Sequence, residues 1–333
     1  MKVKSLIAFL ITSQFFLSLC PAQNGEIRFN LVEGNNGKAL DQINAITQDP
    51  HGYMWFSGQG ANCLYRYDGT HMTAFKHDSL NPNSLSGASH METVFADKSG
   101  LIWVGFFIGG LDQYNPSTGI FKHYINDPKD SGSLSAGPVS VILKDHLDRL
   151  WVGTQNGLDR LDESTGKFIH YRNQPGNPTS LSHNMVRSIY EDSKNVLWIG
   201  TGFEFDDSRP EEGGLNRMEV DGTFTRFKHD PKNPNSLINN KVRAIFEDSR
   251  GNFWIGTAGD GLHIMDREKG LFTRYPYDPK HPEKLSRPPL KEGGLLDPIT
   301  FIREDANGSI WIGTYFSGIN RYDTATKKSL IMK

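Results

Sequence analysis

The stretch Asp248 to Thr257 reads DSRGNFWIGT, and its pattern Asp-x-x-Gly-x-x-Trp-x-Gly-Thr recurs with small variations along the chain. Its repeats centre on all the tryptophans of the sequence, which are Trp55, Trp103, Trp151, Trp198, Trp254 and Trp311. The intervals between these tryptophans are 48, 48, 47, 56 and 57 residues. Periods of this length are typical of repeat architectures, in which each repeat is one unit that packs against the next. The sequence therefore predicts a fold of six similar units.

Two positions of the repeat indicate a tight turn. Six residues before each Trp stands an aspartate: Asp49, Asp97, Asp145, Asp192, Asp248 and Asp305. Three residues before each Trp stands only Gly, Asn or Asp: Gly52, Gly100, Asp148, Asn195, Gly251 and Gly308. Because these types tolerate a positive φ, and an Asp can bond the backbone ahead of it, we expect a β-hairpin connection here. Since the Asp and the Trp recur in every unit, we interpret both as structural, with the Trp packing between units.

The rest of each unit supplies further strands. The apolar run Val242 to Phe246 (VRAIF) does not alternate strictly and predicts a first strand buried on both faces, ahead of the Trp strand. Leu262 and Met265 indicate a third strand, and Phe272 and Tyr275 alternate in a fourth. Four short antiparallel strands make one blade of a β-propeller, so the predicted fold class is an all-β propeller with six visible repeats.

The two ends of the chain leave the closure of the ring open. Both Arg28 to Val32 (RFNLV) and Ser329 to Ile331 are predicted fourth strands, which is one more than six blades need. Either six blades close with a spare strand, or the chain is the front part of a longer protein with a seven-bladed ring. We favour the second interpretation.

The amino terminus has the pattern of a signal peptide over residues 1–22, with Lys2 and Lys4 before an apolar run, which leaves residues 23–333 for the propeller. The run before Cys20 also resembles a lipobox, but leucine directly before the cysteine departs from that motif, so we expect export without lipid attachment. Net charge is −2 and no basic stripe is present, which argues against nucleic acid as a partner. No later apolar segment has the length of a membrane span.

Two insertions break the period, and we expect both on one face. Phe203 to Glu212 separates the second and third strands of the fourth unit, and His281 to Pro298 precedes the sixth. Because strand direction alternates, both connections emerge on the same face, where such insertions often bind partners. Aromatic rings cover the apolar faces of sugars, while carboxylates and amides bond their hydroxyls. The candidate ligand-binding residues on this face are Phe106, Phe107, Gln155, Asn156, Phe203, Glu204, Phe205, Asp206, Asp207, Arg209, Tyr315 and Phe316.

Carboxylates crowd the first insertion, at Glu204, Asp206, Asp207, Glu211 and Glu212. Oxygen-rich clusters suit calcium, but this spacing matches no calcium loop. We therefore interpret the segment as a solvated acidic loop and predict no metal or other cofactor.

The consensus V-x-x-I-x-x-D-x-x-G-x-x-W-I-G-T, followed by G-L-x-x-Y-D and F-x-x-Y, with N-P-x-S-L-S between units, resembles the two-component regulator propeller repeat over residues 28–333. In that family the repeats build seven-bladed propellers, usually two in tandem, in the periplasmic sensor region of hybrid histidine kinases common in Bacteroidetes. A β-sandwich, a membrane helix and the kinase follow. The resemblance implies a periplasmic sensor that recognises an oligosaccharide or another extracellular ligand. None of those additional domains stands in this sequence, so the resemblance also implies the remainder of a sensor kinase, or a partner chain.

Two other functions fit the same pattern. Propeller lyases that act on streptogramin antibiotics have similar repeats, and His90 and His183 precede first strands on the insertion side. These histidines are in separate units without a defined constellation, so we do not predict an enzyme. The second alternative is a protein-interaction scaffold, which periodicity does not distinguish from a ligand sensor.

Overall fold

The computed structural model describes residues 31–34, 40, 42–58, 63–87, 90–206, 208–259, 261–288 and 297–332, which form strands and no helix. Blade 1 comprises β1 (Ile43–Gln48), β2 (Met54–Gly58), β3 (Cys63–Tyr67) and β4 (Met72–Lys76). Blade 2 comprises β5 (Met91–Ala96), β6 (Ile102–Phe106), β7 (Leu111–Asn115) and β8 (Ile120–Tyr124). Blade 3 comprises β9 (Val139–Lys144), β10 (Leu150–Thr154), β11 (Gly157–Asp162) and β12 (Lys167–Tyr171).

Blade 4 comprises β13 (Val186–Glu191), β14 (Leu197–Thr201), β15 (Gly214–Met218) and β16 (Phe224–Phe227). Blade 5 comprises β17 (Val242–Glu247), β18 (Phe253–Thr257), β19 (Leu262–Asp266) and β20 (Leu271–Arg274). Blade 6 comprises β21 (Ile299–Glu304), β22 (Ile310–Thr314), β23 (Ile319–Asp323) and β24 (Lys328–Met332). The predicted all-β propeller of four-stranded blades is therefore confirmed.

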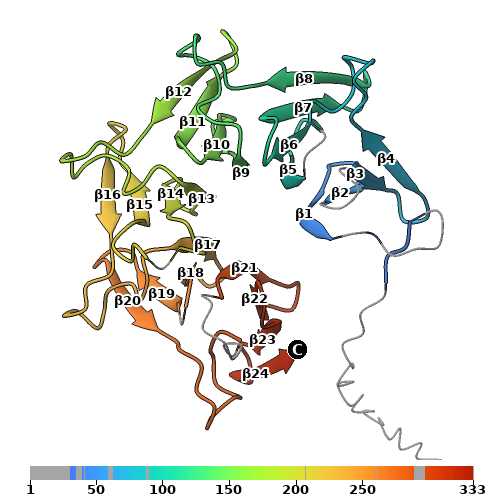
Figure 1. Cartoon of the computed structure of the whole chain (residues 1–333). Coiled ribbons are helices and arrows are strands. Elements are labelled where there is room, and N and C mark those ends of the chain that lie inside the picture. Colours follow the sequence, from blue (N-terminus) through green and yellow to red (C-terminus); the bar gives the residue numbers. More distant parts are fainter. Residues whose placement is uncertain are drawn as a thin grey trace, which may run out of the picture.

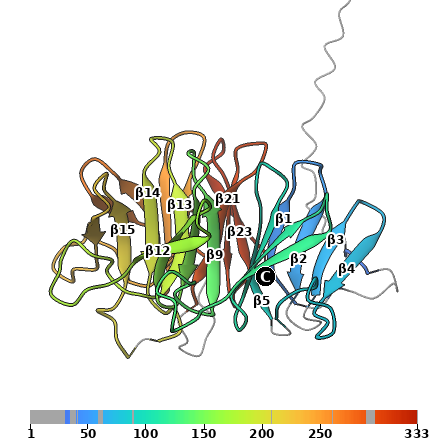
Figure 2. The ribbon, with the colours of Figure 1, turned by 90° about the horizontal axis from the view of Figure 1, so that it is seen from above.

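Each blade is one antiparallel sheet whose strands follow sequence order, and the six blades surround a common axis (Figures 1 and 2). The first strands β1, β5, β9, β13, β17 and β21 lie nearest the axis, and the fourth strands lie at the rim (Figure 1). We call the side with the first-to-second and third-to-fourth connections the hairpin face. The opposite side, with the second-to-third and fourth-to-first connections, is the insertion face.

The repeated aspartate closes the first hairpin and orients the tryptophan. In blade 5, Asp248 Oδ1 accepts hydrogen bonds from the backbone N–H groups of Arg250 and Asn252, at 3.0 and 2.9 Å. Its Oδ2 accepts one from Trp254 Nε1 at 3.0 Å. The same Asp–Trp bond, 2.8–3.1 Å long, is present in all six blades. The predicted positive φ is present in every blade, at Gly52, Gly100, Asp148, Asn195, Gly251 and Gly308. The turn prediction is confirmed, and the Asp–Trp bond adds a role that the sequence did not reveal.

Five of the six tryptophans, Trp55 to Trp254, lie between neighbouring blades, as predicted. They are 0–1% exposed, and each belongs to a hydrophobic cluster shared with the following blade. The small residue two positions after Trp lets the next first strand approach closely. A Cβ at Gly153 would lie 2.7 Å from Val186 Cγ1, and a Cβ at Gly256 would lie 2.6 Å from Ile299 Cγ2. The second strand is therefore buried on both sides, as the pattern of β18 shows.

Blades 1 and 6 differ from the others because no hydrophobic cluster joins them within the described residues. Ile46 of blade 1 is 58% exposed, whereas Ile302, at the same repeat position in blade 6, is 0% exposed. Trp311 is only partly buried. The carboxyl-terminal run Ser329 to Ile331 lies within β24, as predicted. Of the run RFNLV, Leu31 and Val32 lie outside the strands, and residues 28–30 lie outside the described residues, as does the predicted signal peptide.

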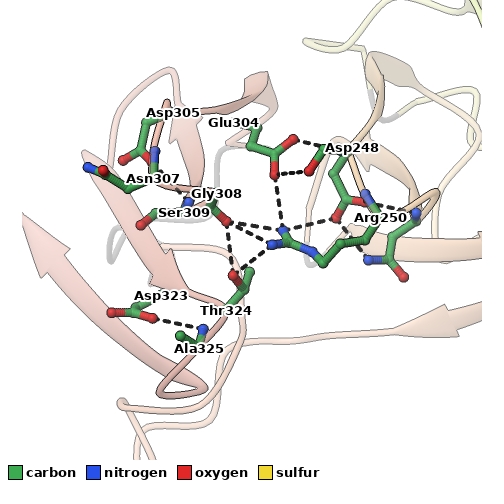
Figure 3. A network of polar contacts seen from close by, with 12 residues as sticks. Asp248, Arg250, Glu304, Asp305, Asn307, Gly308, Ser309, Asp323, Thr324 and Ala325 are labelled. Atoms are coloured by element: carbon green, nitrogen blue, oxygen red, sulfur yellow. Dashed lines mark hydrogen bonds and ion pairs between the residues drawn. The ribbon is translucent and has the colours of Figure 1, made fainter.

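Polar contacts also fasten the blades at the hairpin face. Between blades 5 and 6, the backbone N–H and Oγ of Ser249 each donate to the Glu304 carboxylate at 2.7 Å. Arg250 extends the same network to the Gly308 carbonyl and to Thr324 Oγ1 (Figure 3). Comparable bonds join Ser193 of blade 4 to Glu247 of blade 5. The same type of contact between neighbouring blades therefore recurs on this face, and these side chains have a structural role.

Candidate ligand site on the insertion face

The residues directly before β17 of blade 5 anchor the blade 4 insertion, Phe203 to Glu212. Lys241 is 2% exposed, and its Nζ donates to the carbonyl oxygens of Arg209 and Glu212, at 2.5 and 3.1 Å. Burial lowers the pKa of this ammonium group. The Asn240 side chain adds a bond of 2.9 Å to the Pro210 carbonyl. These bonds satisfy the backbone of the insertion and hold it over the insertion face.

The second insertion holds the β22–β23 connection of blade 6. Arg287 and Asp297 form an ion pair of 2.9 Å, and their side chains are 0% and 1% exposed. Asp297 Oδ1 accepts a hydrogen bond from the Phe316 N–H at 2.9 Å, and the Pro298 carbonyl accepts one from the Tyr315 N–H at 3.1 Å. Residues 289–296 of this insertion lie outside the described residues.

The two anchored segments bring four rings together, although blades 4 and 6 are not neighbours. The Phe205 ring centroid lies 5.8 Å from that of Phe203, 5.2 Å from that of Tyr315 and 6.4 Å from that of Phe316. Tyr315 and Phe316 are 4.6 Å apart. All four side chains remain 40–52% exposed. We call these four residues the aromatic cluster, and it contains four of the predicted site residues.

A buried charge group lies beside the aromatic cluster. Glu204, between Phe203 and Phe205, is 2% exposed. Its Oε1 lies 2.5 Å from Arg187 Nη2 and 3.3 Å from Arg243 Nε, while its Oε2 has no hydrogen-bond partner. Burial raises the pKa of Glu204, but the two guanidinium groups outweigh it and lower the pKa overall. Burial and the charge of Arg187 lower the pKa of Arg243 to about 10.

The two arginines are site residues that the sequence reasoning missed. They stand eleven residues before the Trp of their blades, on the first strands that surround the axis. This position is polar in every repeat, although the strand around it is apolar: Asn44, Glu92, Ser140, Arg187, Arg243 and Thr300. A polar position of varying residue type within an otherwise apolar strand was the signal in the sequence that could have indicated these arginines.

One predicted site residue is wrong. Phe106 is the last residue of β6 and is 0% exposed, within the cluster that joins blades 1 and 2. It stands where other units have the Thr of the Trp-x-Gly-Thr pattern, and Thr154 and Thr201 are likewise fully buried. The side chain three residues after Trp therefore points into the blade, and the ring of Phe106 is not accessible to a ligand.

Other predicted residues lie on the face but outside the aromatic cluster. Phe107 is 39% exposed and stacks on His90, with centroids 4.7 Å apart. In blade 3, Gln155 is exposed, whereas Asn156 is used by the fold, since its amide donates to the Ser135 carbonyl at 3.3 Å.

The acidic residues of the blade 4 insertion are divided among different partners. Asp206 accepts from Ser208, and Arg209 Nη1 donates to Glu212 at 3.1 Å. Asp207 lies outside the described residues. Among the residues that the structure describes, no group of three His, Cys, Asp or Glu is placed to hold a metal ion.

The two histidines considered for catalysis have separate surroundings. His90 Nε2 lies 2.9 Å from Glu92 Oε1. His183 Nδ1 accepts a bond from the Met185 N–H at 3.1 Å, its Nε2 lies 3.3 Å from Glu212, and burial lowers its pKa. No described contact joins these histidines, which belong to blades 2 and 4.

The blades define a β-propeller. Its insertion face differs from its hairpin face because two of the connections there carry insertions without counterparts in the other blades. Three segments of the chain match the family model of the two component regulator propeller, at residues 180–203, 236–259 and 293–316. These three segments therefore resemble the two-component regulator propeller repeat. A comparison with curated proteins gave no match.

Solved structures show a similar likeness. The extracellular domain named as part of the hybrid two component system BT3049 from Bacteroides thetaiotaomicron is 27% identical, with a TM-score of 0.69 over 89% of this chain. The chain spans 35% of the length of that protein. Virginiamycin B lyase from Staphylococcus aureus is 16% identical, with a TM-score of 0.59 over 87% of this chain and 84% of the lyase.

PorZ, a surface component of the type-IX secretion system of Porphyromonas gingivalis, is 14% identical, with a TM-score of 0.57 over 92% of this chain and 43% of PorZ. At these identities the lyase and PorZ show the shared propeller fold alone. The chain thus resembles an extracellular sensor domain. In the part of the chain that the structure describes, no helix has the length and apolar character needed to cross a membrane.

Proposed function

We propose that this chain is the ligand-recognition part of an extracellular sensor, and that it binds an oligosaccharide at the aromatic cluster without transforming it. The observation that carries the proposal is the convergence of four exposed rings from blades 4 and 6. Aromatic rings left uncovered on a monomer, yet fixed by buried anchors, are suited to stack on the apolar faces of sugar rings. The likeness to the sensor domain of Bacteroides thetaiotaomicron supports the same function.

The ligand binds outside the cytoplasm, and the ligand-bound chain transmits the signal to another part of a sensor or to a partner chain. The insertion face suits this arrangement because its two insertions come from different blades. A ligand that bridges Phe205 and Tyr315 would couple blade 4 to blade 6, and such differential contacts are what allow a ligand to shift a conformational equilibrium.

A thermal-shift screen of the purified chain against neutral and acidic plant and host oligosaccharides tests this function. A ligand that prefers the folded chain raises the melting temperature, by an amount that follows its concentration relative to its Kd. We expect one class of sugar to raise it, and the double variant Phe203→Ala/Phe205→Ala to lose the effect.

The matched control is Val220→Ala, a fully exposed apolar residue of the same blade in the β15–β16 hairpin. It should retain the whole shift. A shift that survives in the Phe203/Phe205 double variant would place the binding site elsewhere. A cooperative melt that no sugar alters would count against oligosaccharide binding.

A further inference from the structure

The buried charge group beside the aromatic cluster has an unusual composition. Two guanidinium groups, from Arg187 and Arg243, share one carboxylate oxygen of Glu204. These three side chains carry a net charge of +1. The Nε atoms of both arginines and Oε2 of Glu204 are buried and make no hydrogen bond, although Arg243 Nε lies within ion-pair distance of Glu204 Oε1. Buried polar groups are rarely left in this state, and each one costs free energy until a partner supplies the missing bond.

The arginines also differ from an ordinary structural ion pair in their access to solvent. Their side chains are 12% and 23% exposed, whereas Glu204 is 2% exposed. They come from first strands, which surround the axis of the ring (Figure 1). Glu204, the residue between Phe203 and Phe205 of the aromatic cluster, contacts both arginines, and Tyr315 is among the groups that raise the pKa of Arg243 against the larger effect of burial. A molecule stacked on the aromatic cluster could therefore reach the guanidinium groups.

Glu204 shows which chemistry fits between the arginines. A carboxylate is planar, and a guanidinium group matches it with parallel N–H donors. Glu204 belongs to an inserted loop, not to a strand. Its carboxylate lies between the arginines without being fixed by a sheet, so the carboxylate of another molecule could replace it there.

We propose that Arg187 and Arg243 form a carboxylate subsite that Glu204 fills in the free chain, and that the ligand is an acidic oligosaccharide whose uronic acid group takes the place of Glu204. This inference rests on the proposed function, since it assigns the sugar ring of the same ligand to the aromatic cluster. The charge of Glu204 competes with the ligand. Its displacement releases the start of the blade 4 insertion, so occupancy of the subsite changes the insertion face.

Two probes that differ only in the relevant group provide the test. The α-1,4-linked trigalacturonate carries carboxylates where α-1,4-linked galactotriose carries CH2OH groups. Calorimetry on the full chain at low and high salt should give trigalacturonate an affinity at least tenfold higher than that of galactotriose. The difference should shrink in 1 M NaCl, because screening weakens charge pairing.

Variants identify the groups responsible. Glu204→Gln keeps the shape of the side chain and removes the competing charge, so the affinity for trigalacturonate should rise at least tenfold and that for galactotriose should not change. Arg243→Met should abolish the preference for the acidic probe and keep galactotriose binding. Lys269→Met is the control, since this lysine is 71% exposed in the β19–β20 connection of the hairpin face, and it should behave as the unmodified chain.

Equal affinities for the two probes, or a Glu204→Gln variant that binds trigalacturonate no better, would overturn the carboxylate subsite and leave sugar binding at the aromatic cluster intact. Absence of trigalacturonate binding to both the unmodified chain and Glu204→Gln would also overturn it, while another sugar from the panel could still support the proposed function. If Arg243→Met does not fold, Glu204→Gln and the salt dependence decide alone. Competition by inorganic sulfate as strong as by free galacturonate would replace the carboxylate by a general oxyanion and contradict the uronic acid assignment.

Discussion

The hairpin face and the insertion face of this propeller use similar residues for opposite purposes. On the hairpin face, Asp248 and Trp254 bond to one another, are buried, and have counterparts in all six blades. On the insertion face, Glu204 and Phe205 have no counterparts, and the ring of Phe205 remains 40% exposed. A carboxylate beside an aromatic residue is therefore structural where it repeats. Where it occurs once, beside a ring that buried anchors hold exposed, it is a candidate for binding.

The largest difference should come from truncating a buried tryptophan. Trp254→Ala removes a ring packed between blades 5 and 6, and we expect a loss of about 3–5 kcal/mol in the free energy of unfolding. Trp311→Ala should cost less than half of this, because no following blade covers Trp311 in the described structure. Urea unfolding of both variants measures the two values. Equal losses would show that Trp311 is as well covered as the others.

The aspartates of the hairpin face should govern the response to acid. Burial opposes ionisation of Asp248, but bonds from Asn252 and Trp254 outweigh it and lower its pKa below the ordinary 3.8. A lowered pKa stabilises the fold above pH 3.8, and this stabilisation is lost as pH falls through the folded value. Asp97, Asp145 and Asp305 have pKa values shifted in the same direction.

We expect Asp248→Ala to lose about 2–3 kcal/mol at pH 7, because it leaves Trp254 Nε1 and turn N–H groups without their acceptor. The unfolding free energy of this variant should also fall less steeply than that of the unmodified chain as pH drops below about 4. Urea titrations at pH 7 and pH 3 measure both effects. An acid response identical in variant and parent would exclude Asp248 from it.

On the insertion side, a histidine gives the opposite pH dependence. His170 Nδ1 lies 2.6 Å from the buried Asp159, and its Nε2 lies 2.9 Å from the Ser131 carbonyl. The bond to Asp159 raises the pKa of His170 above its ordinary 6.5, so its stabilisation is present below pH 6.5 and is lost as pH rises through the folded value.

We expect His170→Gln to cost about 1 kcal/mol at pH 6 and less at pH 9. Arg226→Gln is the comparison, because Arg226 bonds the blade linker at the Ser180 and Leu181 carbonyls, and a guanidinium group keeps its charge over this range. Its cost should be the same at both pH values. A pH-independent cost for His170→Gln would contradict the assigned proton.

The smallest effect on stability should come from the aromatic cluster itself. Phe205→Ala removes a side chain that is already 40% exposed, and we expect a cost of about 1 kcal/mol or less. The variant should nevertheless lose ligand binding, which the thermal shift reports. A loss of stability as large as that of Trp254→Ala would instead give Phe205 a structural role and weaken the contrast between the faces.

Sequence alone was sufficient for most of what depends on one repeat and its neighbour. The blade, the turn with Gly251 in the left-handed region, the packing of Trp254 and the common face of the insertions all follow from local patterns, because the strands of each blade pack on those of the next. The repeat also explains the wrong prediction at Phe106. This ring takes the place of the buried Thr of the repeat, whereas the prediction treated it as an exposed ligand-binding residue.

The candidate site was decided by tertiary structure. Phe205 and Tyr315 are distant in sequence and lie in blades that are not neighbours, so only the curvature of the ring brings their rings to 5.2 Å. The pairing of Arg187 and Arg243 with Glu204 likewise needs two first strands and an inserted loop in one place. Periodicity records which residues recur and therefore identifies the scaffold. It contains no information on which of the unique residues meet from blades that are not neighbours.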